Sequence, residues 1–463
     1  MSARAVQARA ILLALAVVAL GYALQVNQGA YHRQAIPLLL ATLGLVLASQ
    51  ALPTRGALRE SDQDPVLLVI GIGVAVQLGV LATARPGISF PSQPADLVPY
   101  YFALAVAGVI VGSALSAAPW LGKAGMPLLL LVHFAIGAWL LGHGSKPHID
   151  VYAWHEEAFR LLTDGSNPYS GTMPNIYPHA RWYGPNMVEN GRVLVGFPYP
   201  PLSLLLAGMG RLAGDYRYAT LSAITLSGMF MAYARPGRLA TAAAALFLFT
   251  PRAYFVVDQG WTEPFLVLLV SFMAFCACRA PKLVPVALGL LLAIKQYMVF
   301  AAPLALLLIP RPWSLRKLAA MFLPAAGVVL VLALPFFTWD PRGFARSIVL
   351  FQATQPFRID SLSVLAWLAR RTKGLTFQGW ITFAAALPIL AHACWRGART
   401  ISGFTAGLAA TILCFFAFSK QAFCNYYFFI IGAACCAVAV TGVLKEESAG
   451  QKGAERPRPF PTG

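Results

Sequence analysis

Residues 66–82 read VLLVIGIGVAVQLGVLA and contain no charged side chain. The stretches ILLALAVVALGYAL at 11–24 and ITFAAALPILAHA at 381–393 have the same character. With their apolar flanks, such runs are long enough to cross the ~30 Å hydrocarbon layer of a membrane as helices. Because backbone polar groups in lipid must be satisfied within the protein, many such runs predict an all-α, polytopic transmembrane helical bundle.

The composition agrees with a membrane location. Apolar residues make up 58% of the 463 positions and charged residues 11%, whereas soluble domains carry about 25% charged residues. The net charge of +18 is explained by basic loops beside anionic headgroups, so we expect membrane lipids and not nucleic acid as partners. The seven cysteines show no metal-ligand spacing and no disulfide framework.

The apolar runs predict about 12 spans, together with a helical hairpin and interfacial helices in an outer loop. We expect the first run to be a retained span and not a cleaved signal peptide. The predicted helical segments are 9–24, 36–53, 66–83, 98–118, 126–142, 218–234, 238–250, 261–278, 283–294, 296–309, 318–338, 377–394, 403–419 and 425–443.

The distribution of Lys and Arg predicts that both termini are cytoplasmic. This topology requires two assignments, one for residues 200–213 and one for residues 283–309. Residues 200–213 lie in the interface or re-enter, and residues 283–309 form a hairpin with Lys295 near its tip; one long tilted helix is the alternative for 283–309. The basic residues assigned to the cytoplasmic side are Arg4, Arg9, Arg55, Arg59, Lys123, Arg235, Arg238, Arg279, Lys282, Arg311, Arg316, Lys317, Arg396, Arg399 and those of the tail.

Four motifs follow one another between residues 126 and 310. They are HIDVYAWHEEAFRLLTDGSNPY at 148–169, FPYPPLSLLLAGMGRLAGDYRYA at 197–219, TPRAYFVVDQGWTEPFLVLLV at 250–270 and LLAIKQYMVFAAPL at 291–304. In order and spacing they resemble the polyprenol-phosphate-mannose-dependent mannosyltransferases of the GT-C superfamily. The matching features are an Asp after a span, a Gly-x-Asn-Pro-Tyr turn and Tyr-Pro-Pro-Leu entering an apolar stretch.

The resemblance divides the chain into four parts. These are a four-span N-terminal addition at 1–125, a GT-C-like catalytic core at 126–310 with an outer loop at 143–217, C-terminal transmembrane helices at 311–444, and a disordered cytoplasmic tail at 445–463. The chain departs from the family pattern in its four preceding spans and in a longer loop between Tyr169 and Pro198.

The resemblance implies a hexosyltransferase of the inner (plasma) membrane. It would move a sugar, mannose by family default, from a polyprenyl-phosphate donor to a glycolipid or glycan acceptor on the extracytoplasmic face. The displacement would be inverting and independent of metal, with no cofactor. The predicted outer loops agree, because they contain no Asp-x-Asp motif, and His155 and His179 form no metal-ligand pattern with Glu156 and Glu157. The Asp-x-Asp at 62–64 lies in a loop assigned to the cytoplasmic side.

Asp150 is the candidate catalytic base. Transfer to a hydroxyl needs a base for the acceptor and cationic stabilisation of the departing phosphate. Asp150 starts a helical pattern at 150–163, where a carboxylate at the water–lipid boundary can meet a lipid headgroup. A helix N-cap is the alternative role, and the residues alone leave the two open; the resemblance favours the base.

Basic residues are the candidates for binding the donor phosphate. Lys295 interrupts an apolar stretch, which is costly unless it has an anionic partner. We expect it to bind phosphate and not merely to reach out to water. Arg252 and Arg358 are further candidates, although either would also suit a position facing headgroups.

Six further residues are candidates for binding sugar or acceptor, and each has a plainer alternative. Asp258 and Glu263 would bind sugar hydroxyls, or Glu263 would only begin a helix. The aromatic side chains would stack on a sugar ring or lie in the aromatic belt at the membrane interface. The candidates are Asp258, Gln259, Trp261, Glu263, Tyr199 and Tyr297.

Two other functions remain open: a transporter or flippase of a lipid-linked or polar solute, and a scaffold without catalysis. Broken helices with a buried lysine would suit the transporter. The arrangement of the charged residues distinguishes an enzyme from a transporter. An enzyme predicts Asp150, Glu263 and Lys295 around one cavity that opens sideways to lipid, and a transporter predicts charges along a path through the bilayer.

Overall fold

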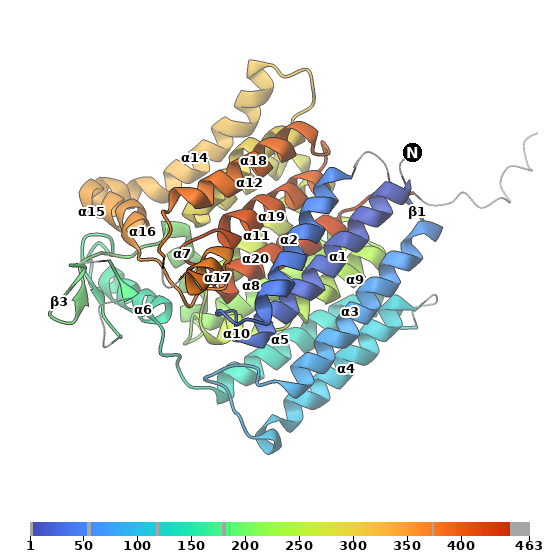
Figure 1. Cartoon of the computed structure of the whole chain (residues 1–463), viewed down its shortest axis with the longest axis horizontal. Helices are drawn as coiled ribbons and strands as arrows, with labels where there is room; N and C mark the ends of the chain where they lie inside the picture. Colours follow the sequence, from blue (N-terminus) through green and yellow to red (C-terminus); the bar gives the residue numbers. More distant parts are fainter. Residues whose placement is uncertain are drawn as a thin grey trace, which may run out of the picture.

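The computed structural model describes residues 3–52, 57–116, 120–177, 182–184, 186–372 and 375–444, which form a helical bundle (Figure 1). The predicted tail at 445–463 lies outside the described residues. The helices at the predicted spans are α1 (Ala3–Val26), α2 (Ala35–Ala51), α3 (Asp64–Thr83), α4 (Val98–Leu115), α5 (Gly125–His143), α8 (Arg217–Ala234), α9 (Arg238–Leu248), α11 (Glu263–Arg279), α12 (Val284–Ile294), α14 (Leu315–Trp339), α18 (Trp380–Arg396), α19 (Ile401–Ala417) and α20 (Cys424–Ala439).

The remaining elements are short. The other helices are α6 (Asp150–Thr163), α7 (Pro201–Arg211), α10 (Ala253–Asp258), α13 (Ala301–Leu304), α15 (Pro341–Ala345), α16 (Phe351–Thr354) and α17 (Val364–Arg371). The strands are β1 (Leu58–Arg59), β2 (Met173–Pro174), β3 (Val188–Glu189), β4 (Arg192–Val193) and β5 (Val443–Leu444). β1 pairs in parallel with β5, and the other three form an antiparallel sheet in the order β2-β4-β3.

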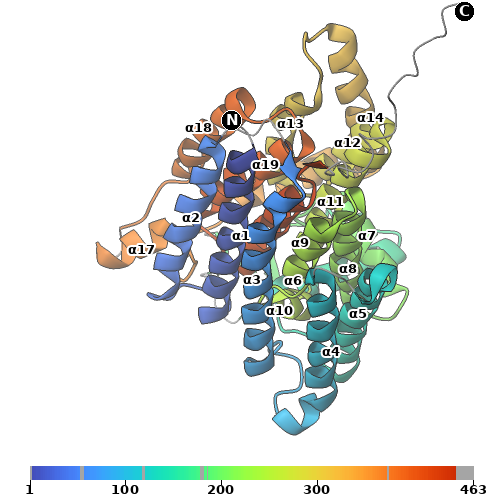
Figure 2. The ribbon, with the colours of Figure 1, turned by 90° about the vertical axis from the view of Figure 1, so that its right-hand side faces the viewer.

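Within the described residues, five helical segments are long and apolar enough to cross a membrane: 3–26, 61–83, 94–115, 122–143 and 315–339. The last of these, α14, lies largely outside the packed bundle (Figure 2). Its side chains Leu323, Leu330 and Val331 are 69%, 58% and 74% exposed. Apolar surface of this extent requires an apolar neighbour, so the chain is a membrane protein with a helical transmembrane bundle. The helices at the other predicted spans are shorter or less apolar.

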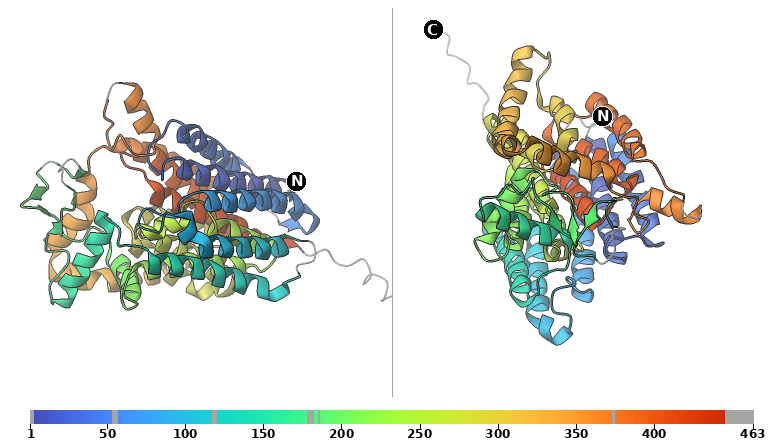
Figure 3. Two further views of the ribbon diagram at one scale, coloured as in Figure 1. Left: turned by 90° about the horizontal axis from the view of Figure 1, so that it is seen from below. Right: turned by 90° about the vertical axis from the view of Figure 1, so that its left-hand side faces the viewer.

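The helices of the bundle run between two ends, which are named here after Arg9 and Asp150. At the Arg9 end, α1 begins, α8 ends, α19 begins and α20 ends; there Ser402 Oγ of α19 donates to Ala437 O of α20 at 2.8 Å. At the opposite, Asp150 end lie α6 and the loop that follows it (Figure 3). The two ends are kept apart by the length of the helices between them.

The predicted break in 283–309 is confirmed. The helix α12 stops at Ile294 because Lys295 has extended backbone angles, φ −157° and ψ 146°. The chain then turns back through short 3-10 and α segments, and Arg399, which precedes α19, reaches Leu306 O at 3.3 Å. Arg279, which ends α11, donates to Tyr233 O near the end of α8 at 3.3 Å. Since α8 ends and α19 begins at the Arg9 end, both flanks of 283–309 lie there, and Lys295 lies at the tip of a hairpin.

The N-terminal helices pack against the C-terminal ones. α1 contacts α2 and α20, and Tyr31 N donates to Asp360 O at 2.8 Å. Gly29 has φ +76°, and a Cβ there would lie 2.5 Å from Cys424 Cα. Glycine is therefore required both for the left-handed backbone and for the close approach. The described residues of α1 and α2 thus pack against the C-terminal part of the bundle.

Candidate active site

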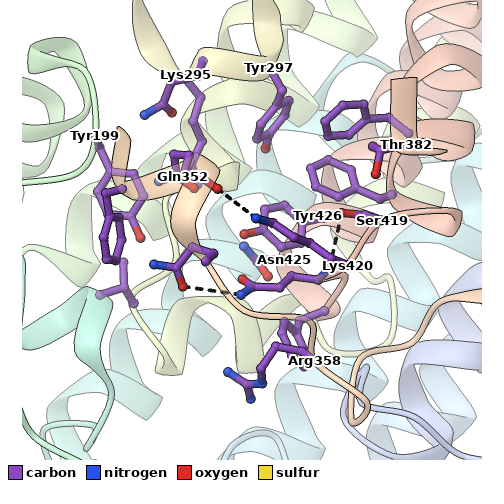
Figure 4. Close-up of a pocket in the computed structure, with 18 of the residues that line it drawn as sticks. Tyr199, Lys295, Tyr297, Gln352, Arg358, Thr382, Ser419, Lys420, Asn425 and Tyr426 are labelled. Atoms are coloured by element: carbon purple, nitrogen blue, oxygen red, sulfur yellow. Dashed lines mark hydrogen bonds between the residues drawn. The ribbon is translucent and has the colours of Figure 1, made fainter. Parts of the chain in front are cut away.

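A cavity of about 810 Å³ lies at the Asp150 end and is called the Asp150 cavity (Figure 4). It forms where the start of α6, the tip at Lys295, the segment around α16 and the turn between α19 and α20 meet. Its lining residues are Ile149, Asp150, Val151, Trp154, Tyr177, Trp182, Tyr199, Trp261, Lys295, Gln296, Tyr297, Val299, Phe300, Phe351, Gln352, Ala353, Gln355, Arg358, Gly379, Thr382, Phe383, Phe415, Phe416, Ser419, Lys420, Gln421, Phe423, Asn425 and Tyr426.

Asp150 occupies the first turn of α6, whose bounds coincide with the predicted helix. The residue at the N-cap is Ile149, which makes no side-chain cap. Asp150 Oδ1 instead accepts from the Val151 N–H at 2.8 Å. Its carboxylate therefore satisfies part of the helix terminus and still borders the cavity.

Burial raises the pKa of the Asp150 carboxyl above its ordinary value. The Val151 N–H, the Arg358 charge and the Tyr177 hydroxyl lower it in part. The Tyr177 hydroxyl also accepts from Asp150 N at 3.3 Å. A carboxylate that is desolvated but hydrogen-bonded is a stronger base than one in free water, which suits proton abstraction.

Lys295 lines the cavity and forms an ion pair within the protein. Its side chain is 6% exposed, and its ammonium pairs with the fully buried Glu263 and donates to Thr262 Oγ1 at 3.1 Å. The same ammonium lies 4.9 Å from the centre of the Tyr199 ring, and Tyr297 Oη donates to Glu263 Oε1 at 3.3 Å. Glu263 thus lies behind Lys295 and does not line the cavity.

Two other cations face the cavity from the loops. Arg358 donates two hydrogen bonds to Asp360, at 2.8 and 2.7 Å, and its guanidinium lies 3.8 Å from the centre of the Trp182 ring. Although burial opposes it, this pairing holds the pKa of Asp360 below its ordinary value. Arg358 is therefore fixed in orientation by an acid and an aromatic face.

Lys420 has only neutral partners. Its ammonium donates to Gln352 O at 3.2 Å and to Ala353 O at 3.0 Å, and no carboxylate of the described part of the chain pairs with it. Burial lowers the pKa of this lysine. A half-buried cation with uncharged partners beside a cavity is a good ligand for an anion.

One wall of the cavity is apolar and reaches the surface of the bundle. It is formed by side chains from the hairpin, α18 and α19, namely Val299, Phe300, Phe383, Phe415 and Phe416. Val299 is 60% and Phe383 50% exposed. The cavity thus joins a charged interior to an apolar opening between helices, an arrangement that fits an amphiphile with a charged head.

Besides Glu263, three predicted site residues do not line this cavity. Arg252 has a left-handed backbone, φ +71°, and donates to Arg85 O at 3.3 Å. Asp258 is fully buried and accepts from Ile88 N at 2.7 Å, and Gln259 donates to it at 3.0 Å. Their contacts hold the loop before α4 in place. Asp150, Lys295, Arg358, Tyr199, Trp261 and Tyr297 are the predicted residues that the structure brings together.

Several lining residues were not expected from the sequence. Lys420 and Gln421 lie in the short turn between α19 and α20, and Gln352 and Gln355 lie near α16. The one available signal was that two polar residues interrupt apolar runs at 420–421. Within the residues that the structure describes, no group of three or more His, Cys, Asp or Glu side chains is placed to hold a metal ion.

Comparisons of the chain with protein-family models, with curated proteins and with solved structures find no match.

Proposed function

We propose that the chain is a membrane glycosyltransferase that moves a hexose from a polyprenyl-phosphate donor to a hydroxyl acceptor. The observation that carries the proposal is the composition of one cavity. A desolvated carboxylate, Asp150, shares it with the cations Lys420 and Arg358 and with an apolar opening. A lipid-linked sugar phosphate has the matching parts: a hydroxylated ring, an anionic linkage and an apolar tail.

The proposed reaction is a single displacement at the anomeric carbon. The acceptor oxygen forms a bond to this carbon while the bond to the donor phosphate oxygen breaks, with inversion. The Asp150 carboxylate takes the proton of the acceptor hydroxyl. The leaving group is the polyprenyl phosphate, whose new negative charge is stabilised by nearby cations.

Lys420 and Arg358 are the proposed phosphate ligands. Lys420 has no carboxylate partner among the described residues, so its charge is available to a donor. Arg358 keeps free N–H groups beyond its two bonds to Asp360. Lys295 contributes less than the sequence indicated, because Glu263 already compensates its charge.

The aromatic rings are assigned to the sugar of the donor, and the apolar wall is assigned to its prenyl chain. Tyr199 and Trp261 line the cavity and offer faces for a sugar ring. The partly exposed Val299 and Phe383 would contact the first prenyl units. The donor would then enter from the lipid between the hairpin and α18.

The proposed topology has about 12 spans with both termini in the cytoplasm. Basic side chains such as Arg235, Arg279 and Arg399 gather at the Arg9 end. By the positive-inside rule this end is cytoplasmic, so the Asp150 cavity opens on the extracytoplasmic face of the inner membrane. The acceptor would be a glycolipid or glycan of the cell envelope.

A transporter or flippase receives less support. Its charges should line a path through the bilayer. Asp150, Lys295, Arg358 and Lys420 instead gather at one end of the bundle. The broken hairpin at Lys295 remains the feature that a transporter would share.

The direct test is turnover by the purified protein in liposomes. The donors are polyprenyl phosphates carrying labelled mannose, glucose, galactose or arabinose, offered with envelope glycolipids or glycans as acceptors. We expect sugar transfer with release of polyprenyl phosphate from one donor, mannose being the first choice. Movement of intact donor between leaflets without transfer from any donor would favour the transporter.

Lys420→Gln should raise the KM for donor by roughly 10- to 100-fold, since a hydrogen bond to a charged group contributes about 1.5–3 kcal/mol. The KM for acceptor should not change. Lys420→Arg keeps the charge and should retain most donor affinity. Lys146→Gln removes an exposed charge near the start of α6 and is the matched control. Equal effects of Lys420→Gln on donor and acceptor would remove Lys420 from the phosphate site.

The dependence of kcat/KM on pH should reflect the ionisation of the Asp150 carboxyl. The base must be ionised, and burial raises its pKa, so kcat/KM should fall with decreasing pH at a higher pH than an ordinary aspartate, near 3.9, would give. Tyr177→Phe removes a hydrogen bond that lowers this pKa, so the acidic limb should move to higher pH. Tyr183→Phe is the control, because the buried Tyr183 hydroxyl has no hydrogen-bond partner among the described residues. An identical shift in both variants would contradict the assignment.

A further inference from the structure

A second, smaller cavity lies at the Arg9 end, on the opposite side of the bundle from Asp150. It has a volume of about 120 Å³, several times the ~10–15 Å³ that one water needs. Four elements meet there: α1, the end of α8, the start of α19 and the end of α20. This Arg9 cavity is lined by Val6, Arg9, Ala10, Leu13, Ala57, Arg235, Thr400, Ser402, Val440, Thr441 and Gly442.

Arg9 is a buried cation for which the described residues supply no anionic partner. It is 6% exposed, and its Nε makes no hydrogen bond. No carboxylate of the described residues forms an ion pair with it. A buried charge in this condition is strongly destabilising unless an anion meets it. The guanidinium borders a cavity large enough to admit one.

Further positive groups point to the same space. Arg235 Nη1 lies against Gly442, where an added Cβ would come within 2.9 Å of it. Thr400 is the N-cap of the 17-residue α19 and accepts from Gly403 N at 3.1 Å, so its hydroxyl hydrogen remains free to donate. The N-terminus of α19 adds the positive end of a helix dipole.

Three nearby acceptors already receive hydrogen bonds. Ala437 O accepts from the hydroxyls of Ser402 at 2.8 Å and Thr441 at 3.1 Å, and Gly442 O accepts from Leu58 N at 2.8 Å. On the adjoining segment, the Asp62 carboxylate accepts from Arg59 N at 3.2 Å. These acceptors are thus at least partly engaged, whereas Arg9 Nε has no hydrogen bond among the described residues.

We infer that the Arg9 cavity binds a phosphate group. Two guanidinium groups, a hydroxyl and a helix N-terminus supply the several donors that a phosphate needs, and arginine forms paired hydrogen bonds with its oxygens. The phosphate belongs either to an anionic lipid headgroup or to a free phosphate ion. Bound there, it ties the start of α1 to α8, α19 and α20. This inference does not depend on the function proposed for the Asp150 cavity.

The test is the apparent Tm of the full chain, delipidated in detergent, in sodium phosphate against sodium chloride at equal ionic strength. A ligand of the folded state raises Tm, so wild type should gain several degrees in phosphate. Arg9→Met should gain nothing. In chloride the same variant should be at least as stable as wild type, since it loses an unpaired buried charge. Arg4→Met alters an exposed arginine of the same helix and should respond as wild type does.

A second arm identifies the source of the phosphate. In vesicles of phosphatidylglycerol the Tm of wild type should exceed that in phosphatidylcholine if a headgroup occupies the cavity, and Arg9→Met should abolish the difference. A shift with sodium phosphate alone identifies the free ion. Arg235→Gln provides an independent variant and should reduce the apparent affinity at least tenfold.

Three results would overturn the inference. The first is no gain for wild type in either arm, and the second is an equal gain for wild type and Arg9→Met. The third is a loss of stability by Arg9→Met in chloride with no response of wild type to phosphate. That last outcome would mean that Arg9 pairs with a carboxylate of the chain itself, such as Glu446 or Glu447, outside the described residues.

Discussion

Asp150→Asn should reduce sugar transfer by about 10²- to 10⁴-fold, the range in which a general base contributes. Asparagine has nearly the same shape, and its side-chain oxygen keeps the bond from the Val151 N–H. It cannot take a proton from the acceptor. Because a desolvated carboxylate is also removed, the stability of the variant should equal or exceed that of wild type. Initial rates with saturating donor and acceptor measure the effect on turnover, and thermal unfolding in detergent measures stability.

Asp164→Asn is the matched control for this prediction. Asp164 follows the other end of α6, is exposed and pairs with Arg160 at 2.7 Å. Its removal should leave turnover within twofold of wild type, because exposed ion pairs contribute little. An Asp150→Asn enzyme that keeps more than a tenth of wild-type turnover would exclude the proposed base. Loss of folding in that variant alone would assign Asp150 to the stability of the helix terminus.

Lys295→Met should be the most destabilising single change near the cavity. It leaves Glu263, which is fully buried, without its cation, and breaking such a pair costs about 3–5 kcal/mol. Tyr297 alone would remain as donor to the carboxylate. The expected result is a large loss of apparent Tm, and the loss of activity should follow the loss of folded protein.

The double variant Lys295→Met with Glu263→Gln separates pairing from packing. If the ion pair is what Lys295 provides, the double variant should be more stable than Lys295→Met alone, and the two changes should not add. Lys420→Met is the control, because Lys420 has no described carboxylate partner and should cost much less stability. Additive losses would show that Lys295 and Glu263 act independently, contrary to the short contact between them.

The helices were the most predictable part of the structure. Each predicted span coincides with a helix or, at 296–309, with a run of short helical turns, because long apolar runs leave the backbone no other means of satisfying its hydrogen bonds. The break at Lys295 was also expected, since two basic flanks required the same end. The short helices α15, α16 and α17 were not, because their mixed polarity gives no clear period.

The site was predictable only in part, for a physical reason. Asp150 and Lys295 are conspicuous because a charge beside or within an apolar run must be compensated. Asp258 is equally conspicuous, but its compensation comes from within the protein, from the backbone N–H groups of Ile88 and Ser89 and from Arg217, whose Nη1 lies 3.8 Å from Asp258 Oδ1. A sequence shows that a charge needs a partner and not whether the partner is protein or ligand. Lys420 was overlooked as a site residue because its turn looks like any short connection between spans.

The contacts of Gly29 with Cys424 and of Tyr31 with Asp360 also bear on how the molecule is made. The first helices leave the ribosome and enter the membrane long before residues 360–424 are synthesised. Until then, the surface around Gly29 has no neighbour, and the turn that holds Lys420 does not exist. Assembly is therefore a late event that joins the first tenth of the chain to residues 360–424, and a nascent protein stopped short of Tyr426 has no complete cavity.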